Sequence, residues 1–190
     1  KNIMMGNGLH KETFGQGEPV VMLHGWAMHS ELWRSFAEKI AEQGYQVTCI
    51  DLAGHGKSRG NFTYGLDEQV RLLSEALPSK PCHIIGWSLG GALACRLAQS
   101  YPNQIRSISL IASNPYFIQS ADWQGMELAD LLAFAESLQK NCQATLLRFM
   151  SLQVQGMDNM KDVLKKIKTS MQMSPAPESA ALDAGLDILQ

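Results

Sequence analysis

The segment Cys82-His83-Ile84-Ile85-Gly86-Trp87-Ser88-Leu89-Gly90-Gly91 joins a short apolar run to a stretch rich in helix formers. Its middle five residues match the pattern G-x-S-x-G. In that pattern the serine lies on a sharp turn between a strand and a helix, and the flanking glycines let the two elements approach closely. The hydroxyl then stands at a helix start, where backbone N–H groups favour negative charge. We therefore predict that Ser88 is a nucleophile rather than part of an accidental Gly-Ser turn.

Strand and helix patterns alternate on both sides of this segment. Apolar runs predict buried strands at 19–23, 45–52, 82–86 and 105–112. Intervening segments predict helices at 30–43, 66–77 and 92–99. Ser30 is the expected N-cap of the first helix, whose apolar face would carry Leu32, Phe36 and Ile40. Strands that alternate with helices predict an α/β fold with a mostly parallel sheet and helices on both faces.

The composition changes after Pro115. From Met126 onward the chain is rich in Leu, Met, Gln and Lys and lacks strand-like runs. We expect helices there at 126–139, 141–154 and 158–173, and a last short helix that ends near Leu189. The predicted organisation has three parts, which are an N-terminal core part at 1–115, a helical lid insertion at 116–175 and a return towards the core at 176–190.

Two loops complete the candidate site. His24-Gly25-Trp26 follows the first clear strand, where folds with this serine turn place a loop that donates an N–H to the oxyanion of acyl transfer. We predict that the backbone N–H groups of Trp26 and Leu89 form the oxyanion hole, and that His24 organises its loop. The run Asp51–Ser58 matches D-x-x-G-x-G-x-S and is expected to shape the site mouth without a catalytic group. It does not match the phosphate-binding pattern G-x-x-x-x-G-K-[ST].

The composition excludes several classes of function. The 190 residues are 45% apolar and 18% charged, with a net charge of -2, which suits a globular domain and gives no basic surplus for nucleic acid. No apolar run is long enough for a membrane span. The cysteines have no metal or CxxC spacing, so we expect no metal and four buried free thiols, at 49, 82, 95 and 142. Free thiols, and the lack of a signal-peptide pattern at residues 1–6, favour a cytoplasmic location.

The three motifs, taken in their order along the chain, resemble those of the α/β-hydrolase superfamily. This resemblance covers residues 14–115. A narrower resemblance, to the pimeloyl-carrier-protein methyl ester esterases of biotin synthesis, covers nearly the whole chain. It rests on the segments Leu23–Trp26, Gly86–Gly91, Ala112–Pro115, Arg148-Phe149 and Gly185–Leu189. The resemblance implies an α/β-hydrolase fold and a monomeric carboxylesterase that works through a serine acyl-enzyme without metal or organic cofactor. Its substrates would be pimeloyl-[acyl-carrier protein] methyl ester and small-molecule esters.

The resemblance also implies roles for single residues. Ser88 would attack the ester carbonyl, Trp26 and Leu89 would bind the substrate through the oxyanion hole, and Phe149 would line the acyl channel from the lid. Basic side chains of the lid would hold the acidic carrier protein, namely Arg148, Lys161 and Lys165. A further arginine position of the family is Ala144 here, and a solvated helix face is the alternative interpretation for the two lysines.

The histidines depart from the family pattern. The order of the triad in this fold is Ser, acid, His, whereas all five histidines, at 10, 24, 29, 55 and 83, precede Ser88. Acids after Ser88, such as Asp183 and Asp187, would have no histidine to orient. We expect a fragment that lacks the last strands with the acid and the histidine, with an unfinished sheet edge and weak activity by itself.

Three other interpretations of the missing histidine stay open. A second chain would supply the missing part, the domain would bind a ligand or carrier without turnover, or His55 would be an unusual base. The same scaffold would also allow another reaction, such as that of a menaquinone-pathway lyase.

Overall fold

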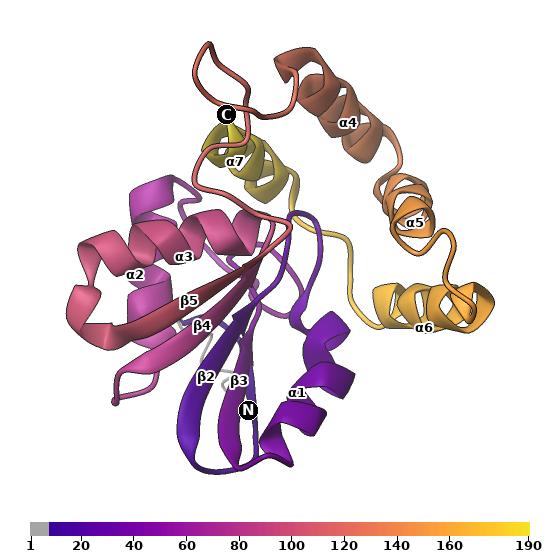
Figure 1. Ribbon diagram of the computed structural model, residues 1–190. Coiled ribbons are helices and arrows are strands. Elements are labelled where there is room, and N and C mark those ends of the chain that lie inside the picture. Colours follow the sequence, from indigo (N-terminus) through magenta and orange to yellow (C-terminus); the bar gives the residue numbers. More distant parts are fainter. Residues whose placement is uncertain (1–7) are drawn as a thin grey trace.

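The structure is a computed structural model that describes residues 8–190 (Figure 1). The signal-peptide prediction for residues 1–6 lies outside this range. In chain order the strands and helices are β1 (Lys11–Phe14), β2 (Glu18–Leu23), η1 (Ser30–Trp33), α1 (Arg34–Ala41), β3 (Tyr45–Ile50), α2 (Leu66–Ala76), β4 (Cys82–Trp87), α3 (Leu89–Ser100), η2 (Pro102–Gln104), β5 (Ile105–Ile111), α4 (Leu128–Lys140), α5 (Cys142–Gln153), α6 (Met160–Gln172) and α7 (Ser179–Leu189).

The five strands form one sheet in the order β1-β3-β2-β4-β5. β2, β3, β4 and β5 pair in parallel, and β1 pairs antiparallel with β3. The helix α1 covers one face, and α2 and α3 cover the other (Figure 1). The mostly parallel sheet with helices on both faces is therefore confirmed. β1 was not predicted, because its sequence KETF has a single large apolar residue and its side chains are exposed or half-buried.

The alternation of side chains along β2 explains its continuous apolar sequence. Val20 and Met22 pack on the α1 side with Ala37, whereas Val21 and Leu23 belong to the core on the opposite face. A parallel strand covered on both faces has no solvent side, so the four positions 20–23 are all apolar. The prediction of four buried thiols was wrong for two of them, since Cys49 and Cys82 are buried whereas Cys95 and Cys142 are only half-buried.

The segment 30–43 differs from its prediction in two ways. Ser30 is not the N-cap, because it is the first residue of the 3-10 turn η1 and His29 takes the N-cap position. Its backbone N–H donates to Oδ1 of Asp51 at 2.7 Å. Phe36 is 43% exposed, and Ala37 is the buried residue of α1. A 3-10 turn has about three residues per turn. That turn shifts the phase of the helix that follows, so Phe36 is turned away from the sheet.

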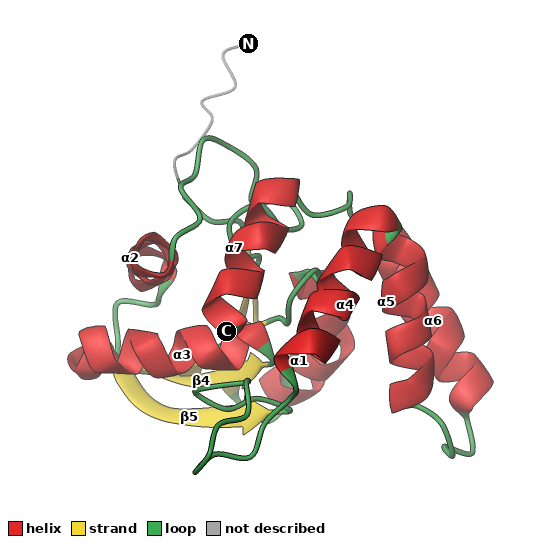
Figure 2. Ribbon diagram, turned by 90° about the horizontal axis from the view of Figure 1, so that it is seen from above, coloured by secondary structure: helices red, strands yellow, loops and turns green. Residues whose placement is uncertain are grey.

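The helices α4, α5 and α6 form a row that we call the arch (Figures 1 and 2). Its first helix, α4, contacts α7, and its last helix, α6, contacts η1, so both ends rest on the sheet-bearing body. The predicted helices at 126–139, 141–154, 158–173 and the last short one are confirmed, with small shifts of their ends. Within residues 8–190, no helix has both the length and the apolar character to cross a bilayer.

The strand β5 lies at one edge of the sheet. Five of its seven residues are exposed, and the large side chains Leu110 and Ile111 are 41% and 42% exposed. An unpaired strand edge with exposed apolar side chains favours association with other strands. Among residues 8–190, β5 therefore has a strand partner on one side only, which is β4.

Candidate active site

Ser88 occupies the turn between β4 and α3. Its backbone has φ +52° and ψ -122°, a combination that residues other than glycine rarely adopt. The neighbouring backbones come very close, because a Cβ on Gly86 would lie 2.6 Å from Cα of Gly91 and one on Gly90 would lie 2.6 Å from the carbonyl oxygen of Leu23. The strained serine turn that the sequence predicts is therefore the conformation that the structure shows.

Hydrogen bonds hold this turn from two sides. The Ser88 N–H donates to the carbonyl oxygen of Ile111 at 3.1 Å, and the hydroxyl of Ser113 donates to the Ser88 carbonyl at 2.7 Å. That carbonyl also accepts from the N–H groups of Gly91 and Ala92 as α3 begins. Among the described residues, no acceptor takes the N–H of Leu89, which is the first residue of α3 and lies beside the serine.

The loop after β2 lies directly against the serine turn. A Cβ on Gly25 would be 3.2 Å from Cβ of Ser88 and 3.0 Å from the ring of Trp87. The next N–H, that of Trp26, has no acceptor within residues 8–190. The Trp26 side chain is 7% exposed, and its Nε1–H donates to the carbonyl oxygen of Leu182 in α7 at 3.0 Å. The structure thus brings two N–H donors, neither with an acceptor among residues 8–190, to the side of Ser88, and the hydrogen bond to α7 holds the side chain of one of them.

Asp51 ties this loop to the run that follows β3. Its side chain is buried, and Oδ1 accepts from the N–H of Ser30 at 2.7 Å while Oδ2 accepts from the N–H of Lys57 at 2.9 Å. Burial alone would raise the pKa of Asp51, but these donors more than offset it and hold the pKa below its usual value. The aspartate of the D-x-x-G-x-G-x-S run therefore has a structural task, which agrees with the predicted shaping role of this loop.

His24 is fully buried and uses both ring nitrogens on the backbone. Its Nε2 accepts from the N–H of Leu52 at 2.9 Å, so Nδ1 carries the proton and donates to the carbonyl oxygen of Gly25 at 2.9 Å. Burial and the nearby His55 lower the pKa of His24 to about 3. A neutral imidazole with both nitrogens engaged organises the loop, as predicted, and has no free site for proton transfer.

The other histidines do not supply a base to Ser88. His55 is fully buried, its Nδ1 lies 3.0 Å from the carbonyl oxygen of Ala53, and burial lowers its pKa to about 4. His83 lies at the opposite end of β4, beside Ser107. In residues 8–190 no histidine is hydrogen-bonded to Ser88. Within residues 8–190 the structure therefore brings the two N–H donors together with Ser88, and no histidine joins them by a hydrogen bond.

An aromatic series connects Trp26 to the arch. The ring centroid of Phe134 in α4 lies 5.9 Å from that of Trp26 and 5.5 Å from that of Phe149 in α5. A cavity of about 440 Å³ adjoins the end of this series and is lined by Phe134, Ser137, Ala144, Thr145, Arg148, Phe149 and Leu152. The sequence reasoning missed Phe134. Its spacing from Leu131, Ala135 and Leu138, the buried residues of α4, marks it as part of the inward helix face.

The three basic residues predicted for carrier docking are exposed. Arg148 lies on α5, and Lys161 and Lys165 lie on α6, which has no buried residue. Within the described part of the chain none of the three forms an ion pair. No group of three or more His, Cys, Asp or Glu residues between 8 and 190 is placed to hold a metal ion.

Comparison with known proteins defines the class first. The profile of a family described as alpha/beta hydrolase fold matches residues 18–183, and the chain belongs to this family. Within it, the chain is 40% identical over 183 residues to the pimeloyl-[acyl-carrier protein] methyl ester esterase of Nitrosomonas europaea, with 96% of this chain and 72% of that protein covered. It is 42% identical over 189 residues to the protein of the same name from Nitrosospira multiformis, with 95% and 71% covered.

Solved structures agree on the fold. An esterase from Exiguobacterium antarcticum superposes with a TM-score of 0.81 at 20% identity, covering 96% of this chain and 69% of that one. A bromoperoxidase from Bacillus anthracis superposes with a TM-score of 0.77 at 23% identity, covering 96% and 70%. The two names describe different reactions, so this likeness defines the architecture alone.

Proposed function

We propose that this chain carries the nucleophile and the oxyanion hole of a carboxylic ester hydrolase that demethylates pimeloyl-[acyl-carrier protein] methyl ester in biotin synthesis. One observation carries the proposal, namely the strained turn that presents Ser88 beside the N–H groups of Trp26 and Leu89, which have no acceptor among residues 8–190. The names of relatives at 40% and 42% identity support the choice of substrate.

The reaction needs two steps at Ser88. The serine oxygen attacks the ester carbonyl carbon and gives its proton to a base. The carbonyl oxygen becomes negative and accepts hydrogen bonds from Trp26 and Leu89, each donor being worth roughly 3 kcal/mol in such sites. The bond from the carbonyl carbon to the methoxy oxygen then breaks, and that oxygen takes the proton back from the base, so methanol leaves. Water then hydrolyses the acyl-enzyme to the free carboxylate. Among residues 8–190, no histidine is hydrogen-bonded to Ser88.

The arch supplies the acyl side of the site in this proposal. Residues 116–175 act as the lid, and Phe149 lines the acyl channel together with Phe134, because both rings continue from Trp26. Exposed cations on the lid attract the acidic carrier protein, which raises the rate of encounter. Arg148 lines the cavity of about 440 Å³ next to Phe134 and Phe149. In this proposal it binds the carrier protein together with Lys161 and Lys165.

The decisive experiment is chemical rescue of the missing base. The 190-residue protein is mixed with pimeloyl-[acyl-carrier protein] methyl ester, and methanol is measured with and without imidazole in solution, which acts as the general base. We expect slow release without imidazole, faster release with it, and no imidazole-dependent release from Ser88→Ala. Release that is unchanged in Ser88→Ala would contradict the proposal.

A second measurement separates turnover from binding alone. An alkylboronic acid adds reversibly to an activated serine and places an oxygen in the oxyanion hole, and ¹¹B NMR reports the tetrahedral adduct. We expect this adduct with the unmodified chain and not with Ser88→Ala. A non-catalytic binding domain would give no adduct, and a lyase would form one but release no methanol.

A further inference from the structure

The helix α7 touches both residues of the proposed oxyanion hole. The carbonyl oxygen of Leu182 accepts from the indole N–H of Trp26 at 3.0 Å. Farther along the helix, a Cβ on Gly185 would lie 2.6 Å from Nε1 of Trp26 and 3.3 Å from Cδ2 of Leu89. Only a residue without a side chain lets the helix backbone come this close to both. A shift of α7 would therefore move or release the side chains of Trp26 and Leu89.

The buried face of α7 offers little that interlocks with its neighbours. It consists of Ala181, Leu182, Gly185 and Leu189, and two of these have a side chain of one carbon or none. Helices keep their relative position by inserting side chains into the grooves of a neighbour, which small residues do poorly. A displacement of about 0.6 Å would break the bond of 3.0 Å to Trp26, since a separation of about 3.6 Å is no longer a hydrogen bond. Contacts outside this face therefore matter for the position of α7.

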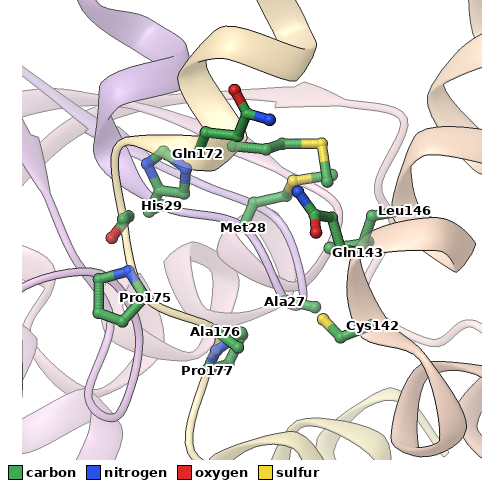
Figure 3. Close-up of a pocket in the computed structure, with 12 residues that line it drawn as sticks. Ala27, Met28, His29, Cys142, Gln143, Leu146, Gln172, Pro175, Ala176 and Pro177 are labelled. Carbon is green, nitrogen blue, oxygen red and sulfur yellow. The ribbon is translucent and has the colours of Figure 1, made fainter.

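A cavity lies beside the segment that leads into α7. Its volume is about 290 Å³. Figure 3 shows Pro175 and Pro177 on one side of this space and Cys142 and Leu146 of α5 on the other. Atoms that border a cavity have no neighbours on that side and lose the dispersion contacts that packing gives. The arch therefore gives this segment little support.

Arg59 supports the same segment from the loop after β3. Its guanidinium donates to the carbonyl oxygens of Pro175 and Ala176, at 3.3 Å for the first of them. Its Nε–H donates to the carbonyl oxygen of Gly56 at 3.0 Å, so the side chain is held to its own loop. That loop is fixed in turn by the buried Asp51. Arg59 thus joins the segment before α7 to the sheet-bearing body.

Glu178 stands at the start of α7 and faces the same loop. It has the N-cap position, but its side chain makes no hydrogen bond to the helix end. Instead its carboxylate accepts from the hydroxyl of Tyr64, and its Oε1 lies 3.6 Å from Nη1 of Arg59. Burial and the Glu178 carboxylate raise the pKa of Tyr64 to about 12, so the phenol keeps its proton and donates. We call Arg59, Tyr64 and Glu178 the latch.

The backbone of Glu178 carries this attachment to Leu182. Its N–H donates to the carbonyl oxygen of Gly54 at 2.9 Å, and its carbonyl oxygen accepts from the N–H of Leu182 at 3.1 Å. Gly54 has φ +74°, and a Cβ there would collide with that of Ala181, so the loop backbone lies directly on α7. A continuous path thus runs from the loop after β3 through Glu178 and Leu182 to Trp26.

We propose that Glu178 is a positioning residue for the oxyanion hole. The latch fixes the start of α7 to the loop after β3, and α7 in turn keeps the N–H groups of Trp26 and Leu89 at Ser88. Glu178 acts through α7 rather than by contact with the ester. Its role rests on the proposed function for the task of the two N–H groups, whereas the link from Glu178 to Trp26 can be measured without it.

Hydrogen exchange of the Trp26 indole tests this link. Its Nε1–H gives a signal in ¹H–¹⁵N spectra that Trp26→Phe identifies, and the hydrogen bond to Leu182 slows its exchange. The amide of Val47 in β3 is the reference, because a general loss of stability would accelerate both signals alike. In Glu178→Ala we expect the indole to gain at least tenfold more in exchange rate than Val47 does. The amide signals of Trp26 and Leu89 should also shift.

Two further variants show whether the latch acts as a unit. Tyr64→Phe removes only the hydroxyl that reaches Glu178 and should give a smaller change of the same kind. The double variant Tyr64→Phe, Glu178→Ala should change the Trp26 signals no more than Glu178→Ala alone, because both substitutions break one contact. If Glu178→Ala does not fold, Tyr64→Phe takes its place in every comparison.

Glu75→Ala is the matched control. It also removes a glutamate that is paired with an arginine, but at an exposed position of α2. The Trp26 signals should stay unchanged in this variant. Equal effects of Glu178→Ala and Glu75→Ala, or additive effects of the two latch substitutions, would overturn the positioning role.

Boronate binding connects the position of α7 to the chemistry at Ser88. The dissociation constant of the alkylboronic acid adduct should rise at least fivefold in Glu178→Ala and stay unchanged in Glu75→Ala. If the unmodified chain forms no adduct, the proposed hydrolysis is contradicted, and the exchange rates still decide whether Glu178 holds Trp26. If the adduct forms and both variants bind the boronic acid equally well, the hydrolysis stands and the positioning role of Glu178 is wrong.

Discussion

The serine turn and the arch are built by different means. At the turn, backbone N–H groups form the proposed oxyanion hole, and the surrounding side chains Leu23, Ile84, Leu89 and Leu93 are fully buried. In the arch, side chains make the contacts, and burial declines along the chain from three buried residues in α4 to none in α6. A site that stabilises a developing charge needs fixed dipoles, whereas a surface that admits and recognises a substrate tolerates variation. Substitutions should therefore act strongly on stability at the turn and weakly at the far end of the arch.

The largest effect on the free energy of unfolding is expected at Gly90, where the backbones of α3 and β2 come very close. In Gly90→Ala the new Cβ would meet the carbonyl oxygen of Leu23 at 2.6 Å, and neither helix α3 nor strand β2 can move without disturbing the core. We expect a loss of about 4 kcal/mol in the free energy of unfolding, at the upper end for single substitutions. Urea denaturation measures it. Gly65→Ala is the matched control, since a Cβ there meets nothing within 4 Å, and it should cost less than about 1 kcal/mol.

The second-largest effect is expected at Asp51, which connects the loop after β2 to the loop after β3. Asp51→Asn preserves the shape but leaves one acceptor oxygen for two N–H donors, those of Ser30 and Lys57. One donor would face the new NH₂ group, so we expect a loss of about 2–3 kcal/mol by urea denaturation at pH 7. Asp67→Asn, at a side chain that is 89% exposed, should change stability by less than about 0.5 kcal/mol. Equal effects of the two substitutions would show that Asp51 does not hold the loops.

A pH titration tests the buried histidines. The folded pKa of His55, about 4, lies below the value near 6.5 of an unfolded chain. Between these values the unfolded state binds the extra proton, so stability is full above pH 6.5 and falls as the pH is lowered through this window. His24 and His29 act in the same direction. In His55→Leu the slope of unfolding free energy between pH 6 and 5 should decrease by about 1 kcal/mol per pH unit. An unchanged slope would mean that His55 accepts a proton in the folded protein.

The sequence predicted the parts of the molecule that depend on local patterns. The strand and helix on either side of Ser88 follow from an apolar run and a glycine-flanked serine, and both are confirmed. The helices of the arch were also predicted, because their composition excludes strands. β1 was missed since only its pairing with β3 reveals it. The hydrogen bond from the Ser30 N–H to Asp51 could not be predicted from the local pattern either, because Asp51 lies 21 residues away.

Contacts across long sequence distances account for the rest of the candidate site. The hydrogen bond from Trp26 to Leu182 spans 156 residues and gives α7 a part in holding the loop after β2. Likewise, the series from Trp26 through Phe134 to Phe149 joins the loop after β2 to two arch helices. Local periodicity marks Phe134 as inward-facing but does not say which residue it meets. Tertiary packing alone brings these rings together.

The smallest effect on stability is expected at the far end of the arch, where the same substitutions should change recognition most. In the double variant Lys161→Glu, Lys165→Glu, both side chains are exposed and without ion pairs in residues 8–190, so the free energy of unfolding should change by less than about 0.5 kcal/mol. Binding of an acidic acyl-carrier protein should weaken at least tenfold at low salt, and the difference should shrink as ionic strength rises, because salt screens exposed charges. Lys39→Glu together with Lys80→Glu changes the net charge equally at positions on the sheet-bearing body. If that control weakens carrier binding as much as the α6 variant does, total charge rather than the arch attracts the carrier, and the recognition role assigned to α6 is wrong.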